Sequence, residues 1–158
     1  MPDETLTIRL ATPDDATIIA EHRARMFQDT GWLDSERATV LVEQVTSMLR
    51  PALASGEYMG WLVIAEDGAV VAGAGAQIRR LLPRPETAVE REALVVNVYV
   101  QRTYRRGGLA RRLMGAILEW SRAQGIERVA LHPTSMGRPL YESLGFVPSN
   151  ELVTYLKP

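Results

Sequence analysis

A six-residue turn, Arg105-Arg106-Gly107-Gly108-Leu109-Ala110, constrains the fold of this chain more than any other stretch. The almost wholly apolar run over residues 93–100 ends shortly before it, and it predicts a strand that is buried on both faces of a sheet. Apolar residues then recur at helical spacing from Leu109 to Trp120, and Gly125 follows as a stop, which predicts an amphipathic helix. A strand therefore feeds a basic glycine turn that opens a helix.

A turn of this kind is suited to holding an anion. The amides of the first helical turn have no intrahelical acceptor and lie at the positive end of the helix dipole, so a phosphate there satisfies both. The two glycines let the backbone approach the anion closely. The chain contains neither GxxxxGK[ST] nor GxGxxG, which argues against nucleoside triphosphate and dinucleotide sites. An ordinary strand-to-helix turn with surface arginines is the alternative.

A second motif, Leu140-Tyr141-Glu142-Ser143-Leu144-Gly145-Phe146, lies further along the chain. It predicts a short helix that ends at Gly145 and is followed by a strand. Read as LYxxxGF, it resembles the closing helix and strand of the GNAT superfamily of N-acyltransferases. The first turn, read as Arg-x-x-Gly-x-Ala, resembles the acetyl-CoA pyrophosphate loop of the same superfamily.

The rest of the chain has the order of elements that this resemblance implies. We expect a strand at residues 6–10, a helix at 13–27, a second helix from Asp34 or Ser35 that Pro51 ends or kinks, a hairpin of 61–65 and 70–75, a loop at 79–88, a strand at 127–132, and final strands at 146–147 and 152–156. The resemblance implies one α/β domain over residues 1–158. Its sheet is mixed and mostly antiparallel, with a central parallel strand pair splayed around the cofactor and helices on both faces.

Composition excludes several classes of function. A formal net charge of −1 gives no general reason to bind nucleic acid or an anionic membrane. Without cysteine, the chain has no disulfide, no thiolate metal site and no cysteine nucleophile, and we expect no metal. It shows no membrane-length apolar span and no signal-peptide pattern, so a cytoplasmic protein is expected.

The resemblance implies an acyl-CoA-dependent N-acetyltransferase that uses acetyl-CoA as co-substrate. The backbone of the strand before the turn binds the pantetheine arm and the thioester oxygen, and the turn binds the pyrophosphate. The LYxxxGF resemblance implies that Tyr141 is the acid that protonates the departing thiolate, and a phenol, which is protonated at neutral pH, can donate this proton. An aromatic residue that packs the short helix is the alternative. Carried over to this sequence, the cofactor-binding residues are Val98, Tyr99, Val100, Arg105, Arg106, Gly107, Gly108, Leu109, Ala110, Arg111 and Ser135.

The general base is not identified by any motif. Asn97 stands where some members carry an acid, and an amide cannot accept the proton of an ammonium group. A histidine side chain can take up a proton near neutral pH, so His132 is the candidate, with a structural histidine as the alternative. Glu92 is a further alternative, and His22 is expected at the surface or in packing. Ser135 either contacts the pantetheine or caps the last helix.

The acceptor pocket is expected between the first two helices, where Phe27, Asp29 and Trp32 are candidates and Asp29 can attract an ammonium group. Packing of the helix corner is the alternative for the aromatic pair. We expect transfer to the primary amine of a small molecule or peptide by direct attack in a ternary complex, and a homodimer stays open. Two further hypotheses are a catalytically silent CoA-binding regulatory domain and a nucleotide-binding domain.

Overall fold

The computed structural model describes residues 5–86 and 89–156. Its elements, in order, are β1 (Thr7–Leu10), a 3₁₀ turn (Pro13–Asp15), α1 (Ala16–Asp29), α2 (Ser35–Ser55), β2 (Tyr58–Ile64), β3 (Val70–Arg80), β4 (Arg91–Val100), a second 3₁₀ turn (Arg102–Tyr104), α3 (Leu109–Ala123), β5 (Arg128–Leu131) and α4 (Arg138–Ser143). Within the described residues the sheet has the order β1-β2-β3-β4-β5, and of its strand pairs only β4-β5 is parallel.

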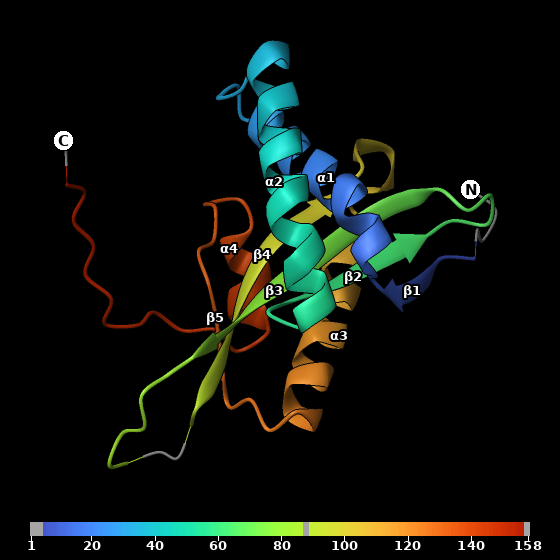
Figure 1. Ribbon diagram of the computed structural model, residues 1–158. Helices are drawn as coiled ribbons and strands as arrows, with labels where there is room; N and C mark the ends of the chain where they lie inside the picture. The colour runs from blue at the N-terminus through green and yellow to red at the C-terminus, as the bar shows by residue number, and fades with distance from the viewer. Residues whose placement is uncertain (1–4, 87–88, 157–158) are drawn as a thin grey trace.

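Helices cover both faces of the sheet, as expected (Figure 1). Alternate residues of β2 show this directly, because successive side chains of a strand point to opposite faces. Trp61 and Val63 belong to the cluster that α3 buries, and Trp61 meets Trp120 of α3 edge to face at 5.6 Å. Tyr58 and Leu62 belong to a separate cluster that α1 and α2 bury. Each face of the sheet therefore has its own apolar core.

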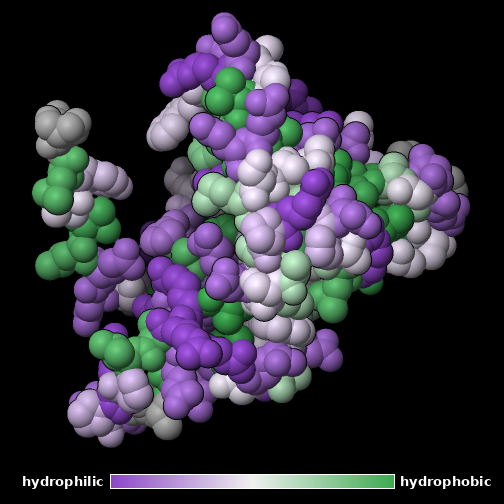
Figure 2. All heavy atoms as spheres, viewed as in Figure 1, coloured by the Kyte–Doolittle hydropathy of each residue, from purple (hydrophilic) through white to green (hydrophobic). Residues whose placement is uncertain are grey.

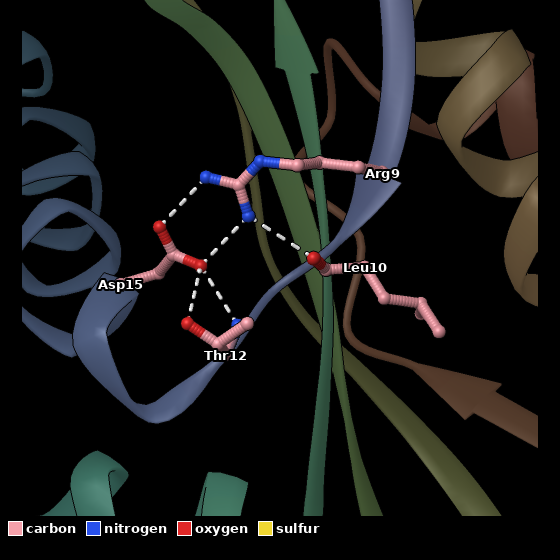
Figure 3. A network of polar contacts seen from close by, with 4 residues as sticks. All are labelled: Arg9, Leu10, Thr12 and Asp15. Atoms are coloured by element: carbon pink, nitrogen blue, oxygen red, sulfur yellow. Dashed lines mark hydrogen bonds and ion pairs between the residues drawn. The ribbon is translucent and has the colours of Figure 1, made fainter.

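The first helical segment is anchored to the edge strand β1 through Asp15 (Figure 3). The Asp15 carboxylate accepts hydrogen bonds from the Thr12 amide at 2.7 Å and from the Arg9 guanidinium at 2.8 Å and 2.9 Å. These bonds favour the ionised form and hold the pKa of Asp15 below its usual value. The side chain thus fixes how the chain turns from β1 into α1.

Local sequence signals account for both ends of α2. Asp34 accepts a hydrogen bond from the Arg37 amide at 2.8 Å and caps the start of α2. Pro51 lies inside the helix and does not end it. The helix ends at Gly56, which has a φ of 80°. Glycine adopts this left-handed conformation easily because it has no side chain.

Two parts of the expected sheet are corrected. Arg79 and Arg80, expected in a loop over residues 79–88, extend β3 and pair with Glu92 and Arg91 of β4; Thr87 and Ala88 of that loop lie outside the described residues. The final strands expected at residues 146–147 and 152–156 are not formed. A strand needs a partner, and an alternating pattern does not supply one. The parallel pair therefore lies at the edge of the described sheet rather than at its centre.

Candidate functional site

The site begins where β4 and β5 separate. Their parallel pairing runs from Glu92↔Arg128 to Val95↔Leu131, and β4 then continues to Val100 without β5 beside it. Val98, Tyr99 and Val100, the expected pantetheine-binding residues, all lie in this unaccompanied stretch. On its other side β4 still pairs with β3, as Gly73↔Tyr99 and Ala72↔Val100. One edge of β4 is thus open to a ligand that hydrogen-bonds to backbone.

A bulge in β4 marks the point of separation. Asn97 has a φ of 58°, and the β3-β4 register shifts between Gly73 and Gly75. Asparagine adopts this left-handed conformation more readily than most residues. The Asn97 carboxamide is held from both sides, because it accepts from Arg23 at 2.8 Å and donates to the Tyr58 hydroxyl at 2.9 Å. Asn97 therefore shapes the strand, which is a different role from that of a carboxylate base.

Tyr58 and Arg23 were missed by the sequence analysis. Tyr58 is 2% exposed, and burial raises its pKa to about 12. Its hydroxyl lies so close to Gly75 that any side chain there would collide with it. The sequence signal was the pair Gly73 and Gly75 inside an apolar strand, which indicates a bulge or a close approach.

The turn after β4 has the backbone geometry of an anion site. Arg106 and Gly108 have φ values of 66° and 78°, and Gly108 is the N-cap of α3. Left-handed residues in such a turn direct successive amides to one side and form a concave anion-binding surface. The positive end of the α3 dipole adds to it. The residues expected to hold the pyrophosphate are thus brought together at the end of the open strand.

The arginines of this region differ in what they contact. Arg105 donates to the Val100 carbonyl at 2.9 Å and to Asp29 at 2.7 Å, and Arg102 lies 3.5 Å from the same carboxylate. Arg111, expected at the pyrophosphate, donates to the Ser143 hydroxyl at 2.7 Å and so links α3 to α4. Asp29 is therefore part of the arginine cluster beside the turn, and its carboxylate is already paired.

Tyr141, the expected acid, lies on α4, and its ring packs edge to face on Phe146 at 6.0 Å. The ring also lies over Gly137, where an added Cβ would be 3.1 Å from it. Burial raises the pKa of Tyr141 above its usual value, so the phenol stays protonated at neutral pH. The side chain is half-buried and lines a groove together with Val129, Ala130 and Leu131 of β5.

The two candidate bases, His132 and Glu92, and the expected pantetheine contact Ser135 have surroundings that support their expected roles less well. His132 is exposed just after β5. Glu92, the alternative base, is buried between Arg79 and Arg128 in the first β4-β5 pair, about 10 Å along the strand from Val95, the last residue that pairs with β5. As a doubly paired carboxylate there, it is unsuited to the role. Ser135 is exposed, and the hydroxyl that accepts from the amide of the α4 N-cap, Gly137, belongs to Thr134.

The expected acceptor residues lie at the end of α1. Phe27 is half-buried, and the Arg23 guanidinium lies 5.1 Å from its ring centre. Trp32 is 77% exposed. Arg23 also donates a hydrogen bond to Asn97, so it connects the β4 bulge to the end of α1.

Among the described residues, no cluster of three acidic or histidine side chains could hold a metal ion, and no helix is long and apolar enough to span a membrane.

His22, on α1, packs in the core beside this site. It is 2% exposed, and its ring lies 4.8 Å from that of Tyr99. Burial, reinforced by Arg25, lowers its pKa to about 4. The unfolded chain takes up a proton near pH 6.5 and the folded chain only near pH 4, so this residue makes the fold less stable as the pH falls between these values.

We therefore expect the free energy of unfolding to fall by about 2 kcal/mol from pH 7 to pH 5 through His22 alone. Urea unfolding at both pH values should show a smaller loss for His22→Leu than for the unsubstituted chain. His132→Leu, at the only other histidine, serves as the exposed control. Equal pH dependence in the unsubstituted chain and His22→Leu would refute this assignment.

The chain resembles known proteins in both sequence and structure. The family model described as the acetyltransferase (GNAT) family matches residues 18–146. This span includes the β4 bulge, the glycine turn and Tyr141. No protein with a curated description matches the sequence.

Solved structures resemble the chain over nearly its whole length. A GCN5-related N-acetyltransferase from Ralstonia eutropha is 29% identical, with a TM-score of 0.85 over 96% of this chain and 99% of the other. A predicted acetyltransferase from Clostridium acetobutylicum, solved with acetyl-CoA, is 20% identical, with a TM-score of 0.86 over 96% of each chain. An aminoglycoside N-acetyltransferase in complex with CoA is 16% identical, with a TM-score of 0.73 over 99% of this chain and 98% of the other. Because the second and third structures are only 20% and 16% identical to this chain, their likeness shows a shared fold alone.

Proposed function

This chain belongs to the GNAT family of acetyltransferases, and from that premise we propose that it transfers an acetyl group from acetyl-CoA to a primary amine by direct attack in a ternary complex. One observation carries the proposal most strongly. The open edge of β4 beyond Val95 leads directly into the left-handed turn at the start of α3. Such a strand edge can bind the extended pantetheine arm of acetyl-CoA, and the turn can bind the pyrophosphate at the end of that arm.

In this proposal the backbone of Val98, Tyr99 and Val100 hydrogen-bonds the pantetheine arm, and the turn holds the pyrophosphate. The solved relative with acetyl-CoA and the one with CoA share the fold and support the choice of co-substrate. Gly107, Gly108, Leu109 and Ala110 offer backbone amides, while Arg106 and Arg105 offer charge. Arg105 is paired with Asp29, so the phosphates compete with this carboxylate for its guanidinium.

The reaction needs an acid and a base. The lone pair of the neutral amine attacks the thioester carbonyl carbon, a carbon–nitrogen bond forms, and the carbon–sulfur bond breaks. The Tyr141 hydroxyl donates its proton to the departing thiolate and is reprotonated from solvent. The nitrogen loses one proton to a base. A water or the exposed His132 takes this role in our proposal, because Asn97 is an amide and Glu92 is occupied by two arginines.

The acceptor is proposed to enter beside the end of α1, near Phe27 and Trp32. Asp29 lies between this corner and the arginines of the turn. Binding of the phosphates by Arg105 would free Oδ2 of Asp29 for an ammonium group, while Arg102 stays beside Oδ1. This coupling supports a sequence in which acetyl-CoA binds before the amine.

An assay of CoA release over a panel of primary amines tests the proposed function. We expect release above the rate of acetyl-CoA hydrolysis with at least one amine, together with a product whose mass is increased by one acetyl group. Binding of acetyl-CoA without release for any amine in a broad panel would instead favour a silent CoA-binding domain. Binding of ATP or NAD without binding of CoA would contradict the proposed function.

A further inference from the structure

A positive charge occupies a position on α1 where the helix otherwise turns apolar side chains inward. Ile19, Arg23 and Phe27 follow one another at intervals of four residues, so they lie on one side of α1. Ile19 belongs to the core that α1 and α2 bury, and Arg23 and Phe27 are half-buried. A partly buried charge costs free energy unless a partner compensates it. The contacts of Arg23 therefore decide what it can bind.

Arg23 has no carboxylate partner within the part of the chain that the structure describes. Its Nη1 donates to the Asn97 carboxamide at 2.8 Å, and its guanidinium carbon lies 5.1 Å from the Phe27 ring centre. An amide and an aromatic ring orient the guanidinium but leave its charge in place. Nε and Nη2 donate to no described residue. They form one edge with two parallel N–H donors, the geometry that binds carboxylates and phosphates.

The nearby charges leave Arg23 uncompensated. The closest acidic residue of the acceptor corner, Asp29, is shared by Arg102 and Arg105 of the turn. Figures 1 and 2 show the corner between the end of α1 and the start of α2 as a mostly hydrophilic surface around a few apolar residues. Phe27 lies one helical turn nearer to this corner than Arg23. An anionic group that enters past Phe27 would therefore meet an unneutralised guanidinium.

We propose that the amine acceptor carries an anionic group, a carboxylate or a phosphate, a few bonds from its amine, and that Arg23 binds this group. The inference rests on the proposed function. Asn97, which Arg23 contacts, immediately precedes Val98 at the start of the proposed pantetheine-binding stretch. A group held by Arg23 therefore stands close to the thioester that the amine attacks. Amino acids and amino phosphates have this form, whereas a polyamine would meet like charge at Arg23.

Matched pairs of amines test the inference, because the members of each pair differ only in the anionic group. α-Amino acids and β-alanine are compared with their carboxamides, and O-phosphoethanolamine with ethanolamine, by the rate of CoA release. We expect kcat/KM to be higher for the anionic member of at least one pair by about tenfold or more, the size of hydrogen bonds to a charged group. The carboxylate and phosphate pairs tell which anion the site accepts.

Arg23→Gln separates anion binding from a purely structural role. Glutamine can still donate to Asn97 but carries no charge. We expect the kcat/KM ratio within the preferred pair to fall to about one, with little change in the affinity for acetyl-CoA. Arg23→Lys should retain part of the preference, because it keeps the charge but not the paired donors. Arg25→Gln, at an exposed arginine of the same helix, is the matched control and should keep the full ratio.

The possible failures are distinguishable from one another. An Arg23→Gln protein that slows both members of a pair equally would overturn the inference, because Arg23 would then only hold the β4 bulge. CoA release with amines that lack an anionic group, and with no preference for those that have one, would also overturn it and leave acetyl transfer intact. No release with any amine of a broad panel would contradict the proposed function, and the inference would fall with it.

Discussion

Replacing Tyr141 by phenylalanine is expected to lower turnover by about 100-fold or more, the size typical of a lost general acid. The substitution removes only the hydroxyl. The ring would keep its contact with Phe146 and its place over Gly137, so the fold and the affinity for acetyl-CoA should barely change. Burial raises the pKa of Tyr141, which keeps the proton available at neutral pH. The measurement is steady-state CoA release on whichever amine proves active.

Tyr155→Phe is the matched control, since it removes the hydroxyl of an 88% exposed tyrosine outside α4. Thermal melts of both variants and the unsubstituted chain separate a catalytic effect from an unfolded protein. A Tyr141→Phe protein that melts normally and turns over within about threefold of the unsubstituted chain would remove the acid role from this residue. Water would then protonate the thiolate, and the cofactor site would be unaffected.

The elements that the sequence predicted well are those whose signals are local. The helix expected after the glycine turn is α3, Leu109–Ala123, because its apolar spacing and its glycine boundaries lie within the segment. The β2-β3 hairpin follows from Gly68 in the same way, with its turn closed by the Ala65 amide donating to the Ala69 carbonyl at 2.9 Å. Family membership and the α/β architecture with helices on both faces are confirmed.

The errors concern features that depend on distant partners. Arg79 extends β3 because Glu92, thirteen positions later, lies beside it and pairs with it. The residues at 152–156 have a strand pattern without a strand, because a pattern does not tell whether a neighbouring edge is within reach. In both cases tertiary context decided the outcome.

The candidate site likewise combines features with local sequence signals and features that depend on distant parts of the chain. The turn and Tyr141 were found from short motifs, whereas the contacts of Asn97 with Arg23 and Tyr58 join three segments of the chain. Nothing local to Asn97 indicates these partners. The pairing of Asp29 with Arg105 likewise joins residues 76 positions apart. It relates the residue expected at the acceptor to the residue expected at the phosphates, and no sequence pattern indicates this link.

Replacing Gly108 by valine is expected to weaken acetyl-CoA binding at least tenfold, or about 1.4 kcal/mol. Gly108 has a φ of 78°, and a Cβ there would meet nothing within 4 Å. The substitution therefore acts through the backbone and through the approach of the phosphates rather than through a collision inside the protein. A β-branched residue resists the left-handed conformation and would turn the amides at the start of α3 away from the anion. Calorimetric titration with acetyl-CoA measures the change.

Gly125→Val is the matched control at the opposite end of α3. Gly125 has a φ of 70° and also has open space around the added Cβ, so both variants carry the same backbone strain, about 1–2 kcal/mol. We expect similar losses in urea unfolding for the two, but normal acetyl-CoA affinity for Gly125→Val alone. Equal affinity in the two folded variants would mean that the glycine turn does not hold the pyrophosphate. The open edge of β4 would then lead to a different ligand, and the choice of co-substrate would rest on family membership alone.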